Sequence, residues 1–267
     1  MVPSPRFMRL RPASRLRGRF RLPGDKSICH RLALFSALAQ GESRLGNFST
    51  SADCQSTLRC LEALGVGVRR QGADVFVTGS GFDALRAAAG PLDAENSGST
   101  LRMLAGILAG RPFRSTLTGD ESLRRRPVER VAAPLRAMGA KLETTDGKPP
   151  LTIDGGGLRA VSWELPVASA QVKTAILLAG LQADGVTTVR EPAPSRDHTE
   201  RLLPAFGARV ETGEGRVSIQ PQAALTPVDL DAPGDVSSAA FFVVAALILP
   251  DSCVRIDGVS LNPRRTA

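Results

Sequence analysis

The feature that most constrains the fold of this chain is a segment that occurs four times. Each copy has a polar lead-in containing Gly or Ser, followed by an apolar stretch of helical length. The copies begin at Pro23, Glu95, Ala168 and Pro233 and read PGDKSICHRLALFSALAQG, ENSGSTLRMLAGILAG, ASAQVKTAILLAGLQADG and PGDVSSAAFFVVAALILP. Aligned on their small polar residues, they recur roughly every 65 to 75 residues. This period predicts one repeated supersecondary unit.

A second element recurs between these segments. It combines a short helix, a Gly at the C-terminal end of that helix, and two strands joined by a turn. Its copies are LEALGVGVRRQGADVFVTG, LRAMGAKLETTDGKPPLTIDG and LPAFGARVETGEGRVSIQ. The stretch GRFRLPG alternates like a strand and leads directly into the first turn. Each unit is therefore predicted to be approximately β-α-β-α-β-β, with three complete units and a fourth that is cut off.

The predicted lead helices are apolar around their whole circumference. In the first, Ile28, Leu32 and Phe35 form one stripe, and Leu34 and Leu38 fill the other side. Such a helix is buried on every face while its first turn stays polar. Helix N-termini that emerge together direct several positive dipole ends at one place, which favours an anion site. Ordinary N-capping by Ser and Asn is the alternative explanation.

Donor side chains beyond the caps favour the anion site. Lys26, Arg31, Arg102, Gln171 and Lys173 lie in the early turns of the repeated helices. Lys and Arg outnumber Asp and Glu by 34 to 26, which gives a net charge of +8 and suits an anionic partner. Nucleic acid is disfavoured, because aromatic residues are only 4% of the chain and are not interleaved with basic ones. A basic composition without a specific ligand is the remaining alternative.

A mononucleotide P-loop is excluded at the first lead helix. The Walker pattern requires Gly directly before its lysine, whereas Asp25 precedes Lys26. Further along, GDESLRRRPVER places Arg126 before Pro127, a residue that suits the first turn of a helix. Arg126 is therefore predicted at a helix entrance, where it can make a bidentate contact with phosphate or carboxylate. A solvated run of arginines is the alternative.

The stretch SRDHTERL predicts a helix start. Asp197 is the expected cap and Glu200, three residues later, completes a capping box. Arg196 lies just outside the cap and is free to reach a ligand. His198 is interpreted as a solvent-exposed helix residue, with a general base as the alternative.

The remaining composition describes an ordinary globular protein. Hydrophobic residues make up 42% of the chain and charged residues 22%. The cysteines show no CxxC pair and no metal-ligand spacing, which predicts free thiols in a reducing compartment. With two histidines, a His-based metal site is disfavoured. No uninterrupted apolar run approaches membrane-spanning length, so we expect a cytoplasmic protein without membrane contact.

Six motifs in order resemble those of the 5-enolpyruvylshikimate-3-phosphate synthase family. They are LPGDKSICHR, NSGSTLR, GDESLRRRP, ASAQVKTAILLAGL, SRDHTE and PGDVSSAAFFVVAALILP. The resemblance begins at about Leu16 and implies an α/β fold, the inside-out α/β barrel of the enolpyruvyl transferases, with three units in each of two domains. Residues 20–228 would then form one complete domain, and residues 1–19 with 229–267 the incomplete start of the second.

The resemblance also implies an activity. Members transfer the enolpyruvyl group of phosphoenolpyruvate to the 5-hydroxyl of shikimate 3-phosphate and release phosphate, a transferase step toward chorismate and the aromatic amino acids. No metal or organic cofactor is needed, because cationic side chains stabilise the developing charge and position both substrates. Glyphosate is the implied inhibitor.

The family motifs assign substrate contacts to individual residues. For shikimate 3-phosphate they imply Lys26, Ser27, Arg31, Ser169, Ala170, Gln171 and Arg196. For phosphoenolpyruvate they imply Lys26, Asn96, Gly98, Arg126 and Gln171, with Arg102 bracing the loop. Lys26 is also the implied catalytic residue, through proton transfer. Two positions depart from the family pattern: Cys29 stands where Ser is commoner, and Ser99 where Thr is usual.

The family's other acid–base groups belong to the second domain, and this sequence stops at LNPRRTA. We therefore expect an N-terminal fragment that is inactive alone and has the missing half of the enzyme as its partner. Two alternatives stay open. UDP-N-acetylglucosamine enolpyruvyl transferase shares the architecture but carries a reactive Cys on a mobile loop, and no cysteine here falls around Arg126. A non-catalytic protein that binds shikimate phosphate is the second alternative.

Overall fold

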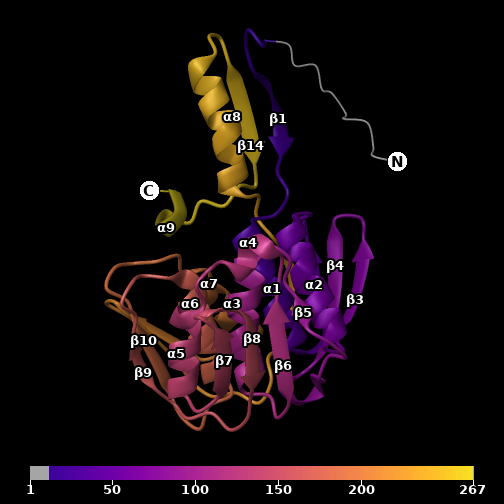
Figure 1. Ribbon diagram of the computed structural model, residues 1–267. Coiled ribbons are helices and arrows are strands. Elements are labelled where there is room, and N and C mark those ends of the chain that lie inside the picture. The colour runs from indigo at the N-terminus through magenta and orange to yellow at the C-terminus, as the bar shows by residue number, and fades with distance from the viewer. Residues whose placement is uncertain (1–11, 267) are drawn as a thin grey trace.

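The computed structural model describes residues 12–266 and shows a body of three sheets with a smaller projecting part (Figure 1). Each sheet of the body has four strands, in the orders β13-β2-β4-β3, β5-β6-β8-β7 and β11-β12-β10-β9. Each combines one parallel pair with two antiparallel pairs. The recurrence of one sheet topology confirms that the chain is built from a repeated unit.

The strands and connecting helices follow the repeat. The first sheet contains β13 (Asp229–Asp231), β2 (Gln40–Gly46), β4 (Asp74–Ser80) and β3 (Gly67–Gln71). The second contains β5 (Leu92–Asp93), β6 (Arg114–Thr118), β8 (Lys148–Asp154) and β7 (Lys141–Thr145). The third contains β11 (Val210–Gly213), β12 (Arg216–Ile219), β10 (Thr187–Arg190) and β9 (Ser162–Glu164). The connecting helices are α2 (Ala52–Ala63), α4 (Glu121–Arg124), α5 (Glu129–Ala137), α7 (His198–Leu202) and the short 3-10 turns η1 (Phe82–Ala84) and η2 (Leu203–Phe206).

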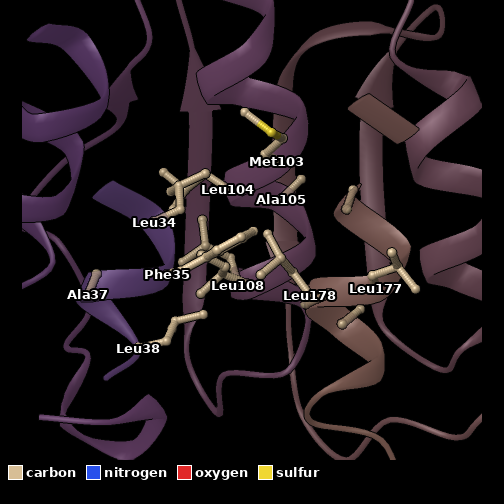
Figure 2. Close-up of a cluster of buried hydrophobic side chains, with 14 of the residues drawn as sticks. Leu34, Phe35, Ala37, Leu38, Met103, Leu104, Ala105, Leu108, Leu177 and Leu178 are labelled. Carbon is tan, nitrogen blue, oxygen red and sulfur yellow. The ribbon is translucent and has the colours of Figure 1, made fainter. Parts of the chain in front are cut away.

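Three lead helices occupy the centre of the body, and the sheets lie outside them. They are α1 (Lys26–Ala37), α3 (Gly98–Ala109) and α6 (Ala170–Gly180). Every residue from Ile28 to Ala37 is buried, as the apolar circumference predicted. Figure 2 shows side chains of the three helices meeting, among them Phe35, Leu108 and Leu178. Helices inside and strands outside are the arrangement that the sequence predicted.

Glycines end the short helix of each unit. Gly65, Gly139 and Gly207 have φ values of +90°, +110° and +80°, a region that side-chain-bearing residues rarely adopt. The three terminal glycines that the sequence indicated are therefore confirmed as helix ends. In the third unit the element before the glycine is the 3-10 turn η2 rather than an α-helix, with a proline at its start.

The first unit does not take its first strand from the preceding sequence. The stretch GRFRLPG does form a strand, β1 (Arg17–Arg21), but this strand pairs in parallel with β14 (Cys253–Asp257) in a separate two-stranded sheet. The strand beside β2 is β13, with Leu230 opposite Leu45. Residues 229–231 therefore lie in the body, three residues beyond the boundary predicted at residue 228.

Two Pro-Gly-Asp turns cross where the body meets the projecting part. The amide of Asp25 donates to Pro233 O at 2.7 Å, and the amide of Asp235 donates to Pro23 O at 3.1 Å. Gly24 must be glycine here, because a Cβ would lie 2.8 Å from the Cβ of Ala232. The Asp25 carboxyl is buried, which raises its pKa. The two chain segments that connect the body to the projecting part therefore run side by side and are hydrogen-bonded to each other.

The projecting part consists of β1, β14 and α8 (Val236–Ile248), followed by α9 (Pro263–Thr266) (Figure 1). Helix α8 begins with the same motif as α1, yet much of its apolar surface is exposed. Phe241, Leu247 and Ile248 have 79%, 80% and 74% of their surface accessible. Within residues 12–266, no helix has both the length and the apolar character to cross a membrane. The four cysteines are free, and only Cys253 is exposed.

Candidate functional site

The site is built on the first turns of the three lead helices. Asp25, Ser97 and Ser169 are their N-caps, and each side chain accepts a backbone hydrogen bond from the first turn. Capping therefore explains these three residues. It does not explain the donor side chains that follow them, which form bonds between the helices and bring their N-termini to one place.

Arg31 joins α1 to α6 and α7. Its side chain is buried, and its guanidinium donates to Thr199 Oγ1 at 2.7 Å, Ser27 O at 2.8 Å, Thr174 Oγ1 at 2.8 Å and Ala170 O at 3.2 Å. All four acceptors are neutral, and within residues 12–266 no carboxylate lies at ion-pair distance from Arg31. Burial lowers the pKa of Arg31 to about 10.

A buried cation with only neutral partners favours an anionic ligand. Moving a charge out of water is costly unless it is paired, and hydrogen bonds to neutral oxygens offset only part of that cost. The carboxylates of Glu200 and Asp25 act on Arg31 only from a distance, and an anion at the first turn of α1 and α6 would supply a direct ion pair. It would also meet the unpaired backbone N–H groups of both helices.

Arg196 approaches this place from the segment between β10 and α7. Its Nη1 donates to Ser27 Oγ at 3.5 Å. A pocket of about 460 Å³ lies beside it, lined by Ala168, Ser169, Ala170, Gln171, Pro194, Ser195, Arg196 and Arg264. The structure therefore brings together the residues that the sequence assigned to shikimate 3-phosphate on α6, together with Ser27, Arg31 and Arg196.

Gln171 connects this pocket to α3. Its Nε2 donates to Ser99 Oγ at 2.8 Å, and its Oε1 accepts from Arg102 Nη1 at 3.2 Å. Arg102 also donates to Gly98 O at 3.3 Å and Pro127 O at 3.2 Å. Burial, together with nearby arginines, lowers the pKa of Arg102. Arg102 thus links the start of α3 to Gln171 and to Pro127.

Arg126 lies between α4 and α5, near the start of α3. Its Nη2 donates to Asn96 Oδ1 and to Ser122 Oγ, the latter at 3.3 Å. Asn96 Nδ2 in turn donates to Asp120 Oδ2 at 2.6 Å. Helix α5 begins at Glu129, so Pro127 precedes the helix instead of occupying its first turn. Arg126 is nevertheless held at the entrance between the two helices.

Gly98 leaves room for the two arginines of this region. A Cβ at Gly98 would lie less than 3.0 Å from Arg102 Nη1 and 3.7 Å from Arg126 Nη1. The space over Gly98 is therefore bounded by two guanidinium groups. A ligand entering it would meet positive charge on two sides.

Lys26 makes an ion pair within the protein. Its Nζ lies 2.6 Å from Asp53 Oδ2, in the first turn of α2, and about half of the Lys26 side chain is exposed. Lys26 and Gln171 are the residues predicted to touch both substrates, and Asp53 holds Lys26 at the edge of the site. Sequence reasoning missed Asp53, because its only signal was an acid in the first turn of another capped helix.

Lys173 differs from the other predicted donors. Its ammonium lies 2.5 Å from Glu191 Oε2 and 2.6 Å from Glu200 Oε1, and all three side chains are buried. The expectation that Lys173 is available to an anionic ligand is therefore wrong, because its charge is paired with two carboxylates of the protein. Glu200 serves this ion pair and not a capping box with Asp197.

Asp197 is the N-cap residue of α7, as predicted, but the bonds of its side chain and the exposure of His198 differ from prediction. Asp197 makes no side-chain cap bond and instead accepts from Asn262 Nδ2 at 2.6 Å and from Arg201 Nε at 2.9 Å. His198 is 3% exposed, so the expected solvent-exposed histidine is wrong. Burial, with Arg31 nearby, lowers the pKa of His198 to about 4. Thr199, which sequence reasoning also missed, binds both Arg31 and Thr174.

Comparison with known proteins identifies close relatives of this chain. The family model described as EPSP synthase (3-phosphoshikimate 1-carboxyvinyltransferase) matches residues 10–267. The 3-phosphoshikimate 1-carboxyvinyltransferase of Solibacter usitatus is 54% identical over 260 residues, 97% of this chain and 61% of that protein. The enzyme of the same name from Bacillus subtilis is 49% identical over 253 residues, 94% of this chain and 59% of that protein.

A solved structure shares the fold. The EPSP synthase from Acinetobacter baumannii matches with a TM-score of 0.89 and 44% sequence identity, over 94% of this chain and 57% of that chain. This likeness confirms the predicted fold class, the inside-out α/β barrel. The present chain spans about three fifths of the length of these relatives.

Proposed function

This chain belongs to the EPSP synthase family, and from that premise we propose that it carries substrate-binding residues of a 3-phosphoshikimate 1-carboxyvinyltransferase. The reaction transfers the enolpyruvyl group of phosphoenolpyruvate to the 5-hydroxyl of shikimate 3-phosphate and releases phosphate. The observation that carries the proposal is the buried Arg31, a cation with four neutral acceptors at the meeting point of helix N-termini.

Shikimate 3-phosphate is assigned to the first turns of α1 and α6. Its phosphate would accept from Arg31, from Ser27 and from Lys26, while Arg196 would supply a further charge-assisted contact. Ser169, Ala170 and Gln171 would line the ring and the phosphate. Support comes from the 460 Å³ pocket that contains the α6 residues and Arg196.

Phosphoenolpyruvate is assigned to the adjoining region over Gly98. Arg126 and Lys26 would bind its two anionic groups, with Asn96 and Gln171 completing the contacts. Support comes from the bond between Arg126 and Asn96 and from the two guanidinium groups that border Gly98. Glyphosate, an anionic molecule, would occupy the same region as an inhibitor.

The proposed reaction brings together two anionic substrates, shikimate 3-phosphate and phosphoenolpyruvate. The 5-hydroxyl would lose its proton as its oxygen attacks C2 of phosphoenolpyruvate, while C3 gains a proton. Phosphate would then leave from C2 of the tetrahedral intermediate as C3 loses a proton, which restores the C2–C3 double bond. Fixed cations stabilise the charge that develops and hold the reactants in attacking geometry. Lys26 would move a proton at its Nζ, and release from Asp53 would allow it to reach the substrates.

The proposed domain organisation follows from the sheet pairing. Residues 22–228 with strand β13 would form one domain, because Phe20 and Arg21 belong to β1, and the projecting residues would belong to a second. The part of the relatives that lies outside the matched region would complete that domain and close over the ligands. Closure would exclude water and add the remaining acid–base groups.

A chimera tests the proposal. The matched region of the Bacillus subtilis relative would be replaced by this chain, and phosphate release from phosphoenolpyruvate would be measured. We expect release that depends on shikimate 3-phosphate and is lost on Arg126→Ala. Release that depends on UDP-N-acetylglucosamine instead would overturn the assignment. A folded chimera that binds shikimate 3-phosphate without turnover would favour the non-catalytic alternative.

A further inference from the structure

Lys173 is a buried residue next to the candidate site, and its side chain does not line the site. It occupies the first turn of α6, two residues after Gln171, and only 1% of its side chain is exposed. Its ammonium joins Glu191, which follows β10, to Glu200, which lies in α7. The two carboxylates also have oxygens, Glu191 Oε1 and Glu200 Oε2, that are buried and have no hydrogen-bond partner in the described residues. The ammonium is therefore the main group that neutralises this buried acidic pair.

The two glutamates are the ends of one segment, residues 191–200. Within the described part of the chain, no backbone amide of residues 192–197 donates to another backbone group, and two of these residues are prolines. Between Glu191, whose amide donates to Gly215 O, and the start of α7, residues 192–196 are thus not held by helix or strand bonds. Lys173 pairs with the glutamates at both ends of the segment. Between them, Asn262 donates to Asp197 and Arg264 donates to Ser195 O.

This segment carries two residues of the shikimate 3-phosphate half of the site. Arg196 lies at its exposed side and reaches Ser27. Thr199, next to Glu200, accepts from Arg31 Nε at 2.7 Å and also bonds Thr174 at 2.6 Å. A shift of Glu200 would therefore move Thr199 and release one of the bonds that orient Arg31.

We infer that Lys173 is a positioning residue for shikimate 3-phosphate. By holding Glu191 and Glu200 together, it fixes residues 191–200 so that Arg196 and the Arg31–Thr199 bond are in place before the ligand arrives. Preorganisation of this kind raises affinity, because less ordering is left to be done on binding. The inference rests on the proposed function, since it assigns a role in binding that ligand.

The test is a double-mutant cycle in the present chain. Lys173→Met, Arg196→Ala and the double variant would be titrated calorimetrically with shikimate 3-phosphate. Each single change should weaken binding about tenfold, the loss expected when one charge-assisted contact disappears. The double variant should lose less affinity than the two single losses multiplied together, because Lys173 acts in part through Arg196 and in part through the Arg31–Thr199 bond. Fully additive losses, or an unchanged affinity of Lys173→Met, would overturn the inference.

Two further variants separate positioning from general stability. Arg111→Met removes another buried cation, paired with Asp83 beyond the far end of α3, and should lower the melting temperature without changing the affinity. If Lys173→Met does not fold, the triple variant Lys173→Met, Glu191→Gln, Glu200→Gln removes the stranded carboxylate charge. It should fold and show the same tenfold loss, whereas wild-type affinity in it would contradict the inference. Absence of binding by the wild-type chain would instead count against the proposed function.

Discussion

Arg31 and Lys173 are both buried cations, and their partners give them opposite roles. Arg31 bonds only neutral oxygens, so its charge is available to a ligand. Lys173 lies between two carboxylates, and the three groups together carry a net negative charge. An anion would be attracted to the first and repelled by the second. The candidate site therefore depends on Arg31 directly and on Lys173 only through the segment it fixes.

Gly98 provides a residue-scale prediction. Gly98→Ala would place a Cβ against Arg102 Nη1, so the Arg102 guanidinium must shift and its bond to Gln171 weakens. In the chimera we expect the KM for phosphoenolpyruvate to rise about tenfold, the loss of a hydrogen bond to a charged group. The affinity for shikimate 3-phosphate should stay within about twofold. An unchanged KM for phosphoenolpyruvate would contradict the assignment of this region.

His198 provides a second prediction, in the pH dependence of stability. Its pKa is about 4 in the folded chain, lowered by burial, against about 6.5 when unfolded. The unfolded chain therefore binds more protons between these values, so the stability due to neutral His198 is complete above pH 6.5 and is lost as pH falls toward 4. The slope is about 1.4 kcal/mol per pH unit.

The matched variant isolates this contribution. In urea unfolding, the free energy of the wild type should fall more steeply between pH 6.5 and 4.5 than that of His198→Gln. Other groups, including the buried Asp25, are common to both proteins and cancel in the difference. Parallel pH profiles would show that His198 is not held neutral by the fold.

At the scale of elements, α3 and α6 approach so closely that a glycine is required. A Cβ at Gly106 would lie 2.7 Å from the Cα of Ala175, and it would be closer still to the carbonyl oxygen of that residue. These are backbone atoms of α6 and cannot move aside as a side-chain end would. The contact holds the N-termini of both helices in one site.

Gly106→Ala should therefore destabilise the body. Alanine is favoured over glycine in a helix by about 1 kcal/mol, but overpacking against a backbone costs more. We expect a net loss of about 2 kcal/mol in the free energy of urea unfolding. Gly90→Ala is the control, because no atom lies within 4 Å of its Cβ position, and it should change stability by less than about 0.5 kcal/mol. Stabilisation by Gly106→Ala would refute the close contact.

The sequence pattern predicted helices and their caps better than it predicted which strands pair and which side chains meet. Apolar residues on all sides identified α1, α3 and α6 as buried helices, and small polar residues identified their caps, because both signals are local. The strand beside β2 was not predictable in the same way, since β13 comes from 185 residues further along the chain, as the pairing of Arg44 with Asp229 shows. Lys173 was misassigned because its partners Glu191 and Glu200 come from other elements, and His198 because its neighbours Arg31 and Asn262 are distant in sequence.

At the scale of the whole molecule, α1 and α8 begin with the same turn and end in different surroundings. Helix α1 is enclosed by α2, α3, α7 and the strands β2 and β4, whereas α8 exposes Phe241, Leu247 and Ile248. The chain spans about three fifths of the length of its relatives, and the proposed second domain would cover α8. The body carries the lead helices Lys26–Ala37 and Ala170–Gly180 complete. The proposed binding of shikimate 3-phosphate can therefore be measured on this chain.

The most direct test is calorimetric titration of residues 1–267 with shikimate 3-phosphate, shikimate and UDP-N-acetylglucosamine. The account predicts saturable binding of shikimate 3-phosphate, at least about tenfold weaker binding of shikimate because its phosphate contacts are absent, and no binding of the UDP-sugar. Arg31→Gln should remove most of the preference for the phosphate. Binding of the UDP-sugar in place of shikimate 3-phosphate, or equal affinity for shikimate with and without its phosphate, would contradict the account.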